Sequence, residues 1–272
     1  MIVEVRYDLN QVIDLIISQP RQVFMKVSII TVTRNCVGTV AECLASVAGQ
    51  TYPHREHIVI DGASMDGTLE VLETWRAQLA VLVSEPDRGS YDALNKGIAR
   101  ASGDVVGLLN ADDRYAGPGV LARIAAAFAD PSVAAVYGDL VYVSQADTGR
   151  VIRYWRAGPY HPRRLARGWM PPHPTLYLRR ELYERHGGFD LGYRIAADYD
   201  LMLRVLSRID GQVVYLPEVL VRMRLGGTSN RSRNLLQKSC EDYQILRRNR
   251  IGGLGTLLLK NVQKLPQFFR RH

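Results

Sequence analysis

The stretch DVVGLLNADD, residues 104–113, ends an apolar run with two adjacent aspartates, Asp112 and Asp113. Its valines and leucines have the composition of a buried strand. Two carboxylates at the end of such a strand repel each other and lose hydration, so their charge requires compensation. Mg²⁺ or Mn²⁺ would supply it, because these ions bind one or two protein carboxylates together with water and phosphate oxygens. The alternative is a solvated turn or a helix cap, where Asp is equally common.

Short β-branched runs alternate with amphipathic segments of helical length around this stretch. Strands are expected at 27–33, 57–61, 80–85, 104–110 and 133–143, with helices at about 40–47, 67–79, 91–101 and 118–129. This alternation predicts an α/β fold with a mostly parallel central sheet flanked by helices. In open α/β sheets, ligands bind at the carboxyl ends of the strands. Asp61 and the Asp112/Asp113 pair both fall at such ends.

Phosphate recognition in this fold is not carried by a standard loop, because the sequence has neither a P-loop nor a dinucleotide fingerprint. In VIDGASMDGT, residues 59–68, the helix that begins at Thr68 could instead face an anion, a ribose or a base edge. The charge of any diphosphate would then be handled by a metal ion.

A candidate general base lies in YRIAADYDLMLRVLSRI, residues 193–209. Apolar residues recur there at helical spacing and predict a helix that begins near Asp198. Burial opposes the charge of a carboxylate at that position while the helix dipole favours it, which leaves an ionised group with few waters. A helix N-cap is the alternative interpretation. Asp200 lies four residues before Arg204 and is expected to form an intrahelical ion pair with it.

The C-terminal segment from Arg231 onward carries ten basic and two acidic residues, so it accounts for the whole net charge of +8. Leucines and phenylalanines are interspersed with these cations, as in helices that lie on a membrane surface. Such a segment favours an anionic surface, either membrane or nucleic acid. Alternatively, it packs on the domain and exposes its charges.

Five ordered motifs make the chain resemble the inverting family-2 glycosyltransferases with the GT-A fold, in particular bacterial exopolysaccharide and lipopolysaccharide enzymes. The matching stretches are VSIITVTRN (27–35), SVAGQTYPHREHIVIDGASMDGT (46–68), EPDRGSYDALNKGIARASGDVVGLLNADD (85–113), GGFDLGYRIAADYDLMLR (187–204) and RLGGTS (224–229). The resemblance implies a metal-dependent, inverting transfer of a sugar from a UDP- or GDP-sugar to a hydroxyl of a saccharide acceptor. A lipid-linked acceptor in surface polysaccharide biosynthesis is expected.

The resemblance also implies roles for individual residues. Thr33 and Asp61 would contact the nucleoside, Asp112 and Asp113 would hold Mg²⁺ or Mn²⁺ against the diphosphate, and Asp198 would be the catalytic base. Further positions are assigned to nucleotide-sugar binding: Asp87, Asp92, Lys96, Gly227 and Ser229. For the last two, an ordinary Gly-rich turn is the alternative. His173 would touch the donor phosphate or the acceptor, or be an ordinary loop histidine.

This chain departs from the family's pattern at four positions. Gly62 stands where the family often has a second aspartate, and Asn110 stands where an aspartate commonly precedes the acidic pair. Ala197 replaces the glutamate that often precedes the base, and Arg34 replaces a frequent aromatic residue. Base recognition, the number of acidic metal ligands and the surroundings of the base are therefore the features expected to differ.

The expected organisation is an N-terminal extension at 1–24, a GT-A domain at 25–229 and a basic helical tail at 230–272. Within the domain, the donor half covers about 25–140 and the acceptor half about 141–229. With no apolar run of about 18 residues and no signal-peptide pattern, a cytoplasmic location is expected, with contact to the inner face of the membrane through the tail.

Two other functions fit parts of the sequence. A sugar-phosphate nucleotidyltransferase would use a related sheet and bound Mg²⁺, but it should carry a Gly-rich, basic loop after the first strand, which TRNCVGTV (33–40) does not supply. A non-catalytic nucleic-acid-binding protein would rely on the basic tail and bind with a steep salt dependence. On the resemblance, no nucleic acid is expected as a partner.

Overall fold

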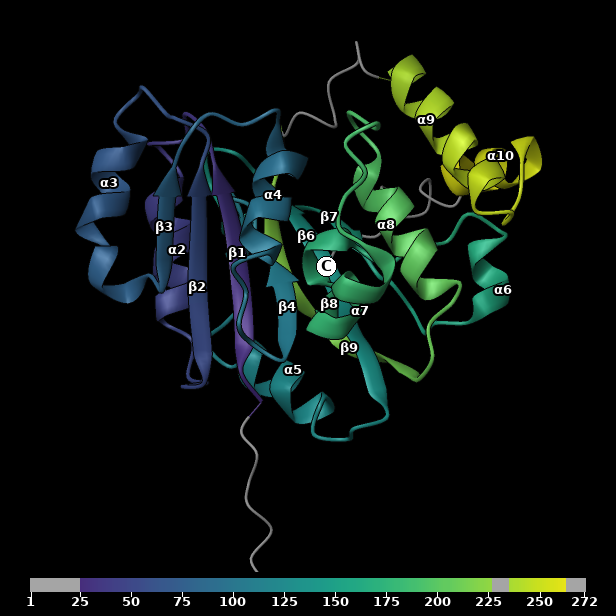
Figure 1. Cartoon of the computed structure of the whole chain (residues 1–272), viewed down its shortest axis with the longest axis horizontal. Coiled ribbons are helices and arrows are strands. Elements are labelled where there is room, and N and C mark those ends of the chain that lie inside the picture. The colour runs from purple at the N-terminus through teal and green to yellow at the C-terminus, as the bar shows by residue number, and fades with distance from the viewer. Residues whose placement is uncertain (1–24, 227–234, 263–272) are drawn as a thin grey trace, which may run out of the picture.

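The computed structural model describes residues 25–226 and 235–262 (Figure 1). The strands are β1 (Val27–Thr33), β2 (Arg55–Asp61), β3 (Val81–Ser84), β4 (Val105–Leu108), β5 (Arg114–Tyr115), β6 (Val133–Val143), β7 (Val151–Trp155), β8 (Tyr177–Arg179) and β9 (Gln212–Arg224). The helices are α2 (Val40–Ala48), α3 (Thr68–Thr74), α4 (Ser90–Ile98), α5 (Val120–Ala127), α6 (Pro162–Leu165), α7 (Arg180–His186), α8 (Ala197–Leu206), α9 (Leu235–Arg248) and α10 (Leu254–Val262), with short 3₁₀ turns η1 (Arg76–Gln78) and η2 (His173–Thr175). The predicted extension at 1–24 lies outside the described residues.

A single nine-stranded sheet has the order β3-β2-β1-β4-β8-β6-β9-β5, with β7 paired to β6. Strands β3, β2, β1 and β4 are parallel, which confirms the predicted α/β architecture in the first half. The direction changes at β8, which is antiparallel to both β4 and β6. The sheet is therefore mixed, with its parallel part formed by the regularly alternating sequence.

Strands β1, β2 and β4 are almost entirely buried because helices cover both faces of the sheet, and most of their side chains are apolar. Packing against the neighbouring strand explains why position 107, in the middle of β4, is a glycine. A Cβ atom there would lie 2.0 Å from the ring of Tyr177 on neighbouring β8. Only glycine allows the two strands to pair with this ring between them.

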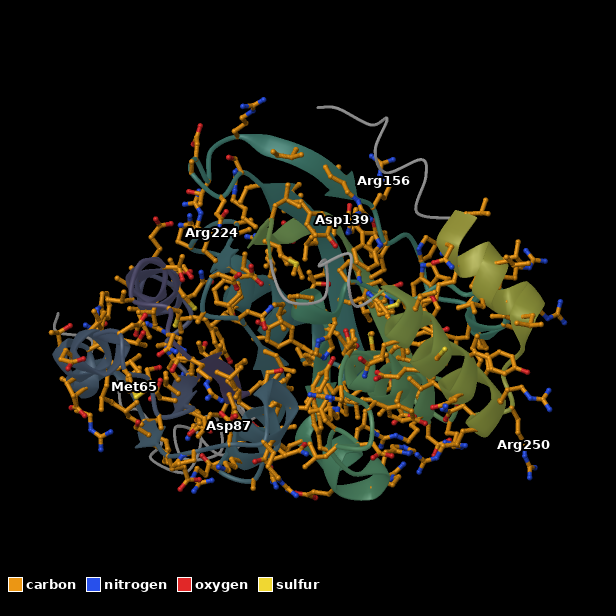
Figure 2. All side chains as sticks on the ribbon, turned by 90° about the horizontal axis from the view of Figure 1, so that it is seen from above. Met65, Asp87, Asp139, Arg156, Arg224 and Arg250 are labelled. Atoms are coloured by element: carbon orange, nitrogen blue, oxygen red, sulfur yellow. The ribbon has the colours of Figure 1, made fainter. Side chains whose placement is uncertain are left out.

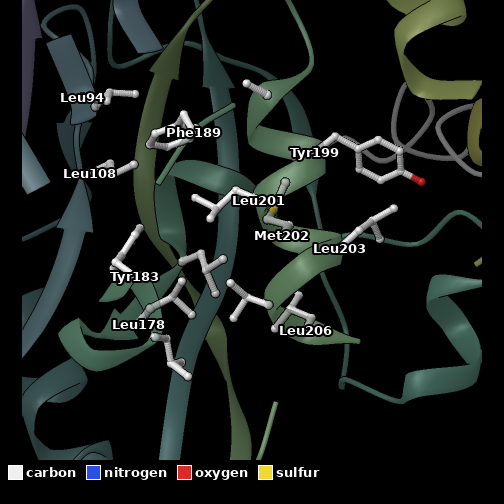
Figure 3. Packing of buried hydrophobic residues seen from close by; sticks show 14 of the residues in the cluster. Leu94, Leu108, Leu178, Tyr183, Phe189, Tyr199, Leu201, Met202, Leu203 and Leu206 are labelled. Atoms are coloured by element: carbon white, nitrogen blue, oxygen red, sulfur yellow. The ribbon is translucent and has the colours of Figure 1, made fainter. Parts of the chain in front are cut away.

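Helix α8 is surrounded by the core of the second half (Figure 3). The apolar stripe predicted for this helix consists of Met202, Val205, Leu206 and Ile209. The first three are buried as expected, whereas Ile209 is half-buried and lies beyond the end of α8. Leu203 is also buried, because α9 covers another side of α8 and adds Ile245 and Leu246 to the same cluster. Apolar residues therefore occur on more than one side of α8, because both the core and α9 pack against it.

The described part of the basic tail forms the two helices α9 and α10, which pack beside α8 and α6 (Figure 1). Asp242 of α9 and Lys260 of α10 form a buried ion pair at 2.7 Å. Figure 2 shows Arg250, between these helices, at the opposite end of the molecule from Met65. Within the part of the chain that the structure describes, no helix has the length and apolar content needed to cross a membrane.

Candidate active site

The parallel strands β1, β2, β3 and β4 point their carboxyl ends to one edge of the sheet, the upper edge in Figure 1, and Figure 2 looks onto it. This edge collects the residues predicted from the sequence. Thr33 and Asp61 end β1 and β2 side by side, since they are paired in the parallel register. Asp87 follows β3, and the Asp112/Asp113 pair lies in the turn between β4 and β5.

Asp61 is completely buried at the end of β2. Its carboxylate accepts hydrogen bonds from the Thr33 hydroxyl at 2.8 Å, the Ser64 amide at 2.9 Å and the Ser84 hydroxyl at 2.7 Å. Burial alone would raise its pKa, but the hydrogen bonds from Ser64, Ser84 and Thr33 outweigh burial and lower it. Asp61 is therefore an ionised group that fixes the loop after β2, with its oxygens occupied by protein donors.

Position 62 is a glycine for a steric reason that the sequence did not reveal. A Cβ atom at this position would lie 2.3 Å from the Oδ2 atom of Asp87. The Asp87 carboxylate thus fills the space beside the end of β2 where the family often has a second aspartate. Asp87 is held there by the amide of Gly89 at 2.8 Å, and the exposed Arg34 guanidinium lies 3.7 Å from it.

Asp92 and Lys96 stabilise the loop that carries Asp87. The amide of Arg88 donates to Asp92 at 3.1 Å, and this hydrogen bond is the main reason that the pKa of Asp92 is lowered. Lys96 pairs with Glu85 at 2.8 Å and donates to the Pro86 carbonyl at 2.9 Å. Direct binding of a nucleotide by Asp92 and Lys96 remains a prediction.

The acidic pair consists of a buried and a more accessible carboxylate. Asp113 is 1% exposed and accepts hydrogen bonds from the Asn110 side chain at 2.8 Å and the Arg224 amide at 3.1 Å. Burial, and then the charge of Asp112, raise the pKa of Asp113 well above its usual range. Burial also raises the pKa of half-buried Asp112, and the positive charge of the Arg224 guanidinium opposes this rise. Asn110 can donate to Asp113, which an aspartate at that position could not do when ionised.

A divalent cation fits this pair, because it would offset the burial and repulsion that oppose the ionisation of both carboxylates. Among residues 25–226 and 235–262, no cluster of three or more His, Cys, Asp or Glu side chains could hold a metal ion. The donor set therefore suits an ion that completes its coordination with diphosphate oxygens and water, rather than an ion enclosed by protein. Gly227 and Ser229, predicted to close over the diphosphate, lie outside the described residues.

Asp198 lies in the first turn of α8, and Ala196 rather than Asp198 is the N-cap residue. Its Oδ1 atom accepts hydrogen bonds from the Tyr199 amide at 2.8 Å and the Tyr91 hydroxyl at 3.4 Å. Within the described ranges, its Oδ2 atom accepts no hydrogen bond. Asp200 is buried and lies 2.6 Å from the Arg204 guanidinium, which confirms the predicted ion pair.

Tyr142, on β6, is buried, and burial raises its pKa. The Arg153 guanidinium opposes this, and the charges of Asp113 and Asp198 both raise the pKa of Tyr142 further. The sequence did not single out Tyr142, because VAAVYGDLVYV (133–143) reads only as a strand. Burial lowers the pKa of half-buried His173, and the negative charge of Asp198 opposes this.

Comparisons with known proteins place this site in a family. The profile described as Glycosyl transferase family 2 matches residues 28–188, more than half of the chain. A PGL/p-HBAD biosynthesis glycosyltransferase of Mycobacterium bovis is 31% identical over 208 residues, which cover 75% of this chain and 78% of that relative.

Two solved structures have similar folds. The S. aureus TarS 1–349 structure in complex with UDP-GlcNAc has a TM-score of 0.62 at 20% identity, covering 83% of this chain and 65% of that one. The mannosyltransferase PcManGT from Pyrobaculum calidifontis, in complex with GDP-Man and Mn²⁺, has a TM-score of 0.62 at 23% identity, covering 93% of this chain and 77% of that one. These likenesses confirm the predicted GT-A fold. With its strand-end carboxylates and the family profile spanning them, the chain belongs to glycosyl transferase family 2.

Proposed function

We propose that this glycosyltransferase is metal-dependent and inverting, and that it moves a sugar from a UDP- or GDP-sugar to a hydroxyl of a saccharide acceptor. The observation that carries the proposal is the presence of the paired carboxylates Asp112 and Asp113 at the strand-end edge, together with Asp198, whose Oδ1 atom is held by the Tyr199 amide and the Tyr91 hydroxyl. One site suits a metal-bound diphosphate, and the other presents a carboxylate oxygen that no described residue occupies. Family membership favours this function over nucleotidyl transfer and nucleic-acid binding.

In the proposed donor site, Thr33 and Asp61 contact the nucleoside. Asp87 lies in the loop beside them, and Asp92 and Lys96 of α4 hold that loop and bind the nucleotide sugar. Asp112 and Asp113 hold Mg²⁺ or Mn²⁺. When bound, the cation acts as a Lewis acid that neutralises the negative charge of the departing nucleoside diphosphate. Asp112, the more accessible carboxylate, would bind the cation, while Asp113 is fixed by Asn110 and Arg224.

Asp198 is the proposed base. Its Oδ2 atom accepts the proton of the acceptor hydroxyl as that oxygen attacks the anomeric carbon. Attack occurs on the face opposite the leaving group, so the configuration inverts. The hydrogen bonds of the Tyr199 amide and the Tyr91 hydroxyl to Oδ1 hold the carboxylate and leave Oδ2 for the acceptor.

The proposed acceptor is a lipid-linked saccharide of surface polysaccharide or glycolipid biosynthesis. The M. bovis relative is named for PGL/p-HBAD biosynthesis, which supports this class. We also propose that α10 rests on the cytoplasmic face of an anionic membrane. It exposes Leu254, Leu258 and Val262, with the exposed cations Arg247 and Arg250 nearby. Each cation at such a surface contributes about 1 kcal/mol.

Calorimetric titration with UDP, GDP, dTDP and CDP, in Mn²⁺ and then in EDTA, tests the donor site. The expected result is binding of UDP or GDP that disappears in EDTA. Folded protein that binds none of the four would overturn the proposal. For the tail, we expect the protein to sediment with phosphatidylglycerol vesicles but not with phosphatidylcholine vesicles. If it sediments with neither kind of vesicle, the proposed membrane role is wrong.

A further inference from the structure

Glu241 of α9 reaches from the C-terminal helices to the start of α8. Although it is charged, its side chain is only 7% exposed. Its Oε2 atom accepts hydrogen bonds from the amides of Ile195 and Ala196, both at 2.9 Å, and Oε1 accepts from the amide of Arg194 at 3.2 Å. One carboxylate thus holds three consecutive amides of the loop that leads to Asp198.

Helix α8 lacks a cap of its own, because its N-cap residue is Ala196, whose side chain cannot accept a hydrogen bond. Amides at the start of a helix have no partner within the helix, and the helix dipole adds positive potential there. The Glu241 carboxylate supplies both a negative charge and acceptors, and hydrogen bonds to an ionised group are stronger than neutral ones. A residue distant in the sequence therefore anchors the N-cap residue Ala196 and the two residues before it.

The loop is also held from its other side by Tyr91 of α4. The Tyr91 hydroxyl lies 2.8 Å from the Ile195 carbonyl, to which it donates, and reaches Asp198 at 3.4 Å. Ile195 is therefore fixed at its amide by Glu241 and at its carbonyl by Tyr91. The position of the Asp198 carboxylate depends on both contacts.

Helix α9 is a rigid support for Glu241. The buried ion pair of Asp242 with Lys260 joins α9 to α10, and the Lys260 ammonium lies 3.2 Å from the ring centre of Tyr199. Figure 3 shows Tyr199 pointing toward these C-terminal helices. Asn249, in the turn directly after α9, donates to Asp200 of α8 at 3.2 Å. The C-terminal helices therefore contact α8 and its preceding loop at residues 194–196, before Asp198, and at Tyr199 and Asp200, after it.

We infer that Glu241 is a positioning residue for the base, and that α9 belongs to the catalytic unit although it lies beyond the residues matched by the family profile. The inference rests on the proposed role of Asp198. Removing the carboxylate releases the loop and lets Asp198 shift. A displacement of about 1 Å at a catalytic group can lower a rate about 100-fold without any change in ligand contacts.

The test compares Glu241→Ala and Glu241→Gln with Arg248→Ala. Arg248, also on α9, pairs with Asp190 at 2.6 Å and interacts with Tyr193, while none of the described hydrogen bonds joins it to residues 194–198, so it is a control for loosening α9 beside the loop. Hydrogen–deuterium exchange is read at the amides of residues 194–196. Faster exchange is expected in Glu241→Ala, an intermediate rate in Glu241→Gln, which keeps one acceptor oxygen, and the wild-type rate in Arg248→Ala.

The rate of nucleoside diphosphate release from UDP-GlcNAc and GDP-mannose is measured on the same proteins. For the donor that reacts, kcat should fall about 10- to 100-fold in Glu241→Ala, with partial recovery in Glu241→Gln and little change in the donor KM. A purely structural role would lower the Tm while sparing both kcat and local exchange. Glu241→Gln serves if the alanine variant does not fold.

Wild-type exchange at 194–196 in both Glu241 variants would overturn the inference, whichever donor reacts. Asp198→Asn is assayed in parallel. If Asp198→Asn is inactive while the Glu241 variants keep the wild-type kcat, only the positioning role fails. If Asp198→Asn is fully active, the proposed base itself is wrong.

Discussion

The hydroxyl of Tyr91 lies 3.4 Å from the Oδ1 atom of Asp198, although the two residues are 107 positions apart in the chain. This contact joins α4 of the first half of the domain to α8 of the second half at the proposed base. The ring of Tyr91 stacks on Phe189 with centroids 5.3 Å apart, so the hydroxyl is held in place. The proposed base thus depends on both halves of the domain for its orientation.

Replacing Asp198 with Asn should abolish sugar transfer while sparing the donor site. The amide keeps the shape of the side chain but cannot accept the proton of the acceptor, and a general base contributes about 10²–10⁴-fold to a rate. Steady-state transfer and calorimetric titration of the nucleotide measure the two effects separately. Transfer at the wild-type rate would refute the assignment.

Asp113→Asn should stabilise the metal-free protein at neutral pH and weaken metal-dependent nucleotide binding. The pKa of Asp113 is raised in the folded state, so folding favours its protonated form. Its contribution to stability is full below its ordinary pKa of about 3.8 and is lost as the pH rises through the raised value. Melting curves in EDTA at pH 7 should show a higher Tm for the variant, by about 2–4 °C per kcal/mol. Added Mn²⁺ should raise the Tm of the wild type more than that of the variant.

Gly62→Ala should displace the Asp87 carboxylate, because the new Cβ atom would lie 2.3 Å from Oδ2. Nucleotide affinity is expected to fall, with a stability loss of about 1 kcal/mol. A double-mutant cycle with Asp87→Ala is the measurement. Once Asp87 is truncated, adding Gly62→Ala should have little further effect. An equal loss in both backgrounds would mean that the clash is not the cause.

His57 should make the protein sensitive to acid. Burial, followed by the nearby Arg55 charge, lowers the pKa of His57 from 6.5 to about 3. The folded state therefore binds this proton poorly, so the contribution of neutral His57 is full above pH 6.5 and is lost as the pH falls toward 3. Urea unfolding from pH 7 to pH 4 should show a weaker pH dependence for His57→Gln than for the wild type. Parallel curves for the two proteins would contradict this.

The fold of the first half of the domain could be predicted from the sequence because its strands and helices are regularly periodic. The strand ends at Asp61 and near Asp112 followed directly from that pattern. Residues that act across the sheet could not be predicted in this way. Arg224 reaches Asp113 through a backbone amide on β9, and Glu241 reaches Ala196 from another helix. Such contacts depend on tertiary packing and leave no local spacing in the sequence.

The full burial of Asp61 also escaped prediction. A polar residue at a strand end is expected to face the ligand edge, but the hydroxyls of Thr33, Ser64 and Ser84 converge on its carboxylate. Those donors come from three different segments of the chain. The sequence therefore located the residue correctly in the fold without indicating what surrounds it.

The enclosed ammonium group of Lys260 provides a chemical reporter. Its side chain is 2% exposed, whereas that of Lys26 is 41% exposed. An amine-reactive reagent should therefore label Lys26 rapidly in the native protein and reach Lys260 only when α10 separates from Tyr199 and Asp242. Because acylation of Lys260 would remove the charge that pairs with Asp242, each such opening would be trapped chemically. The labelling rate of this one lysine would thus measure how often the C-terminal helices detach from α8, the helix that carries the proposed base.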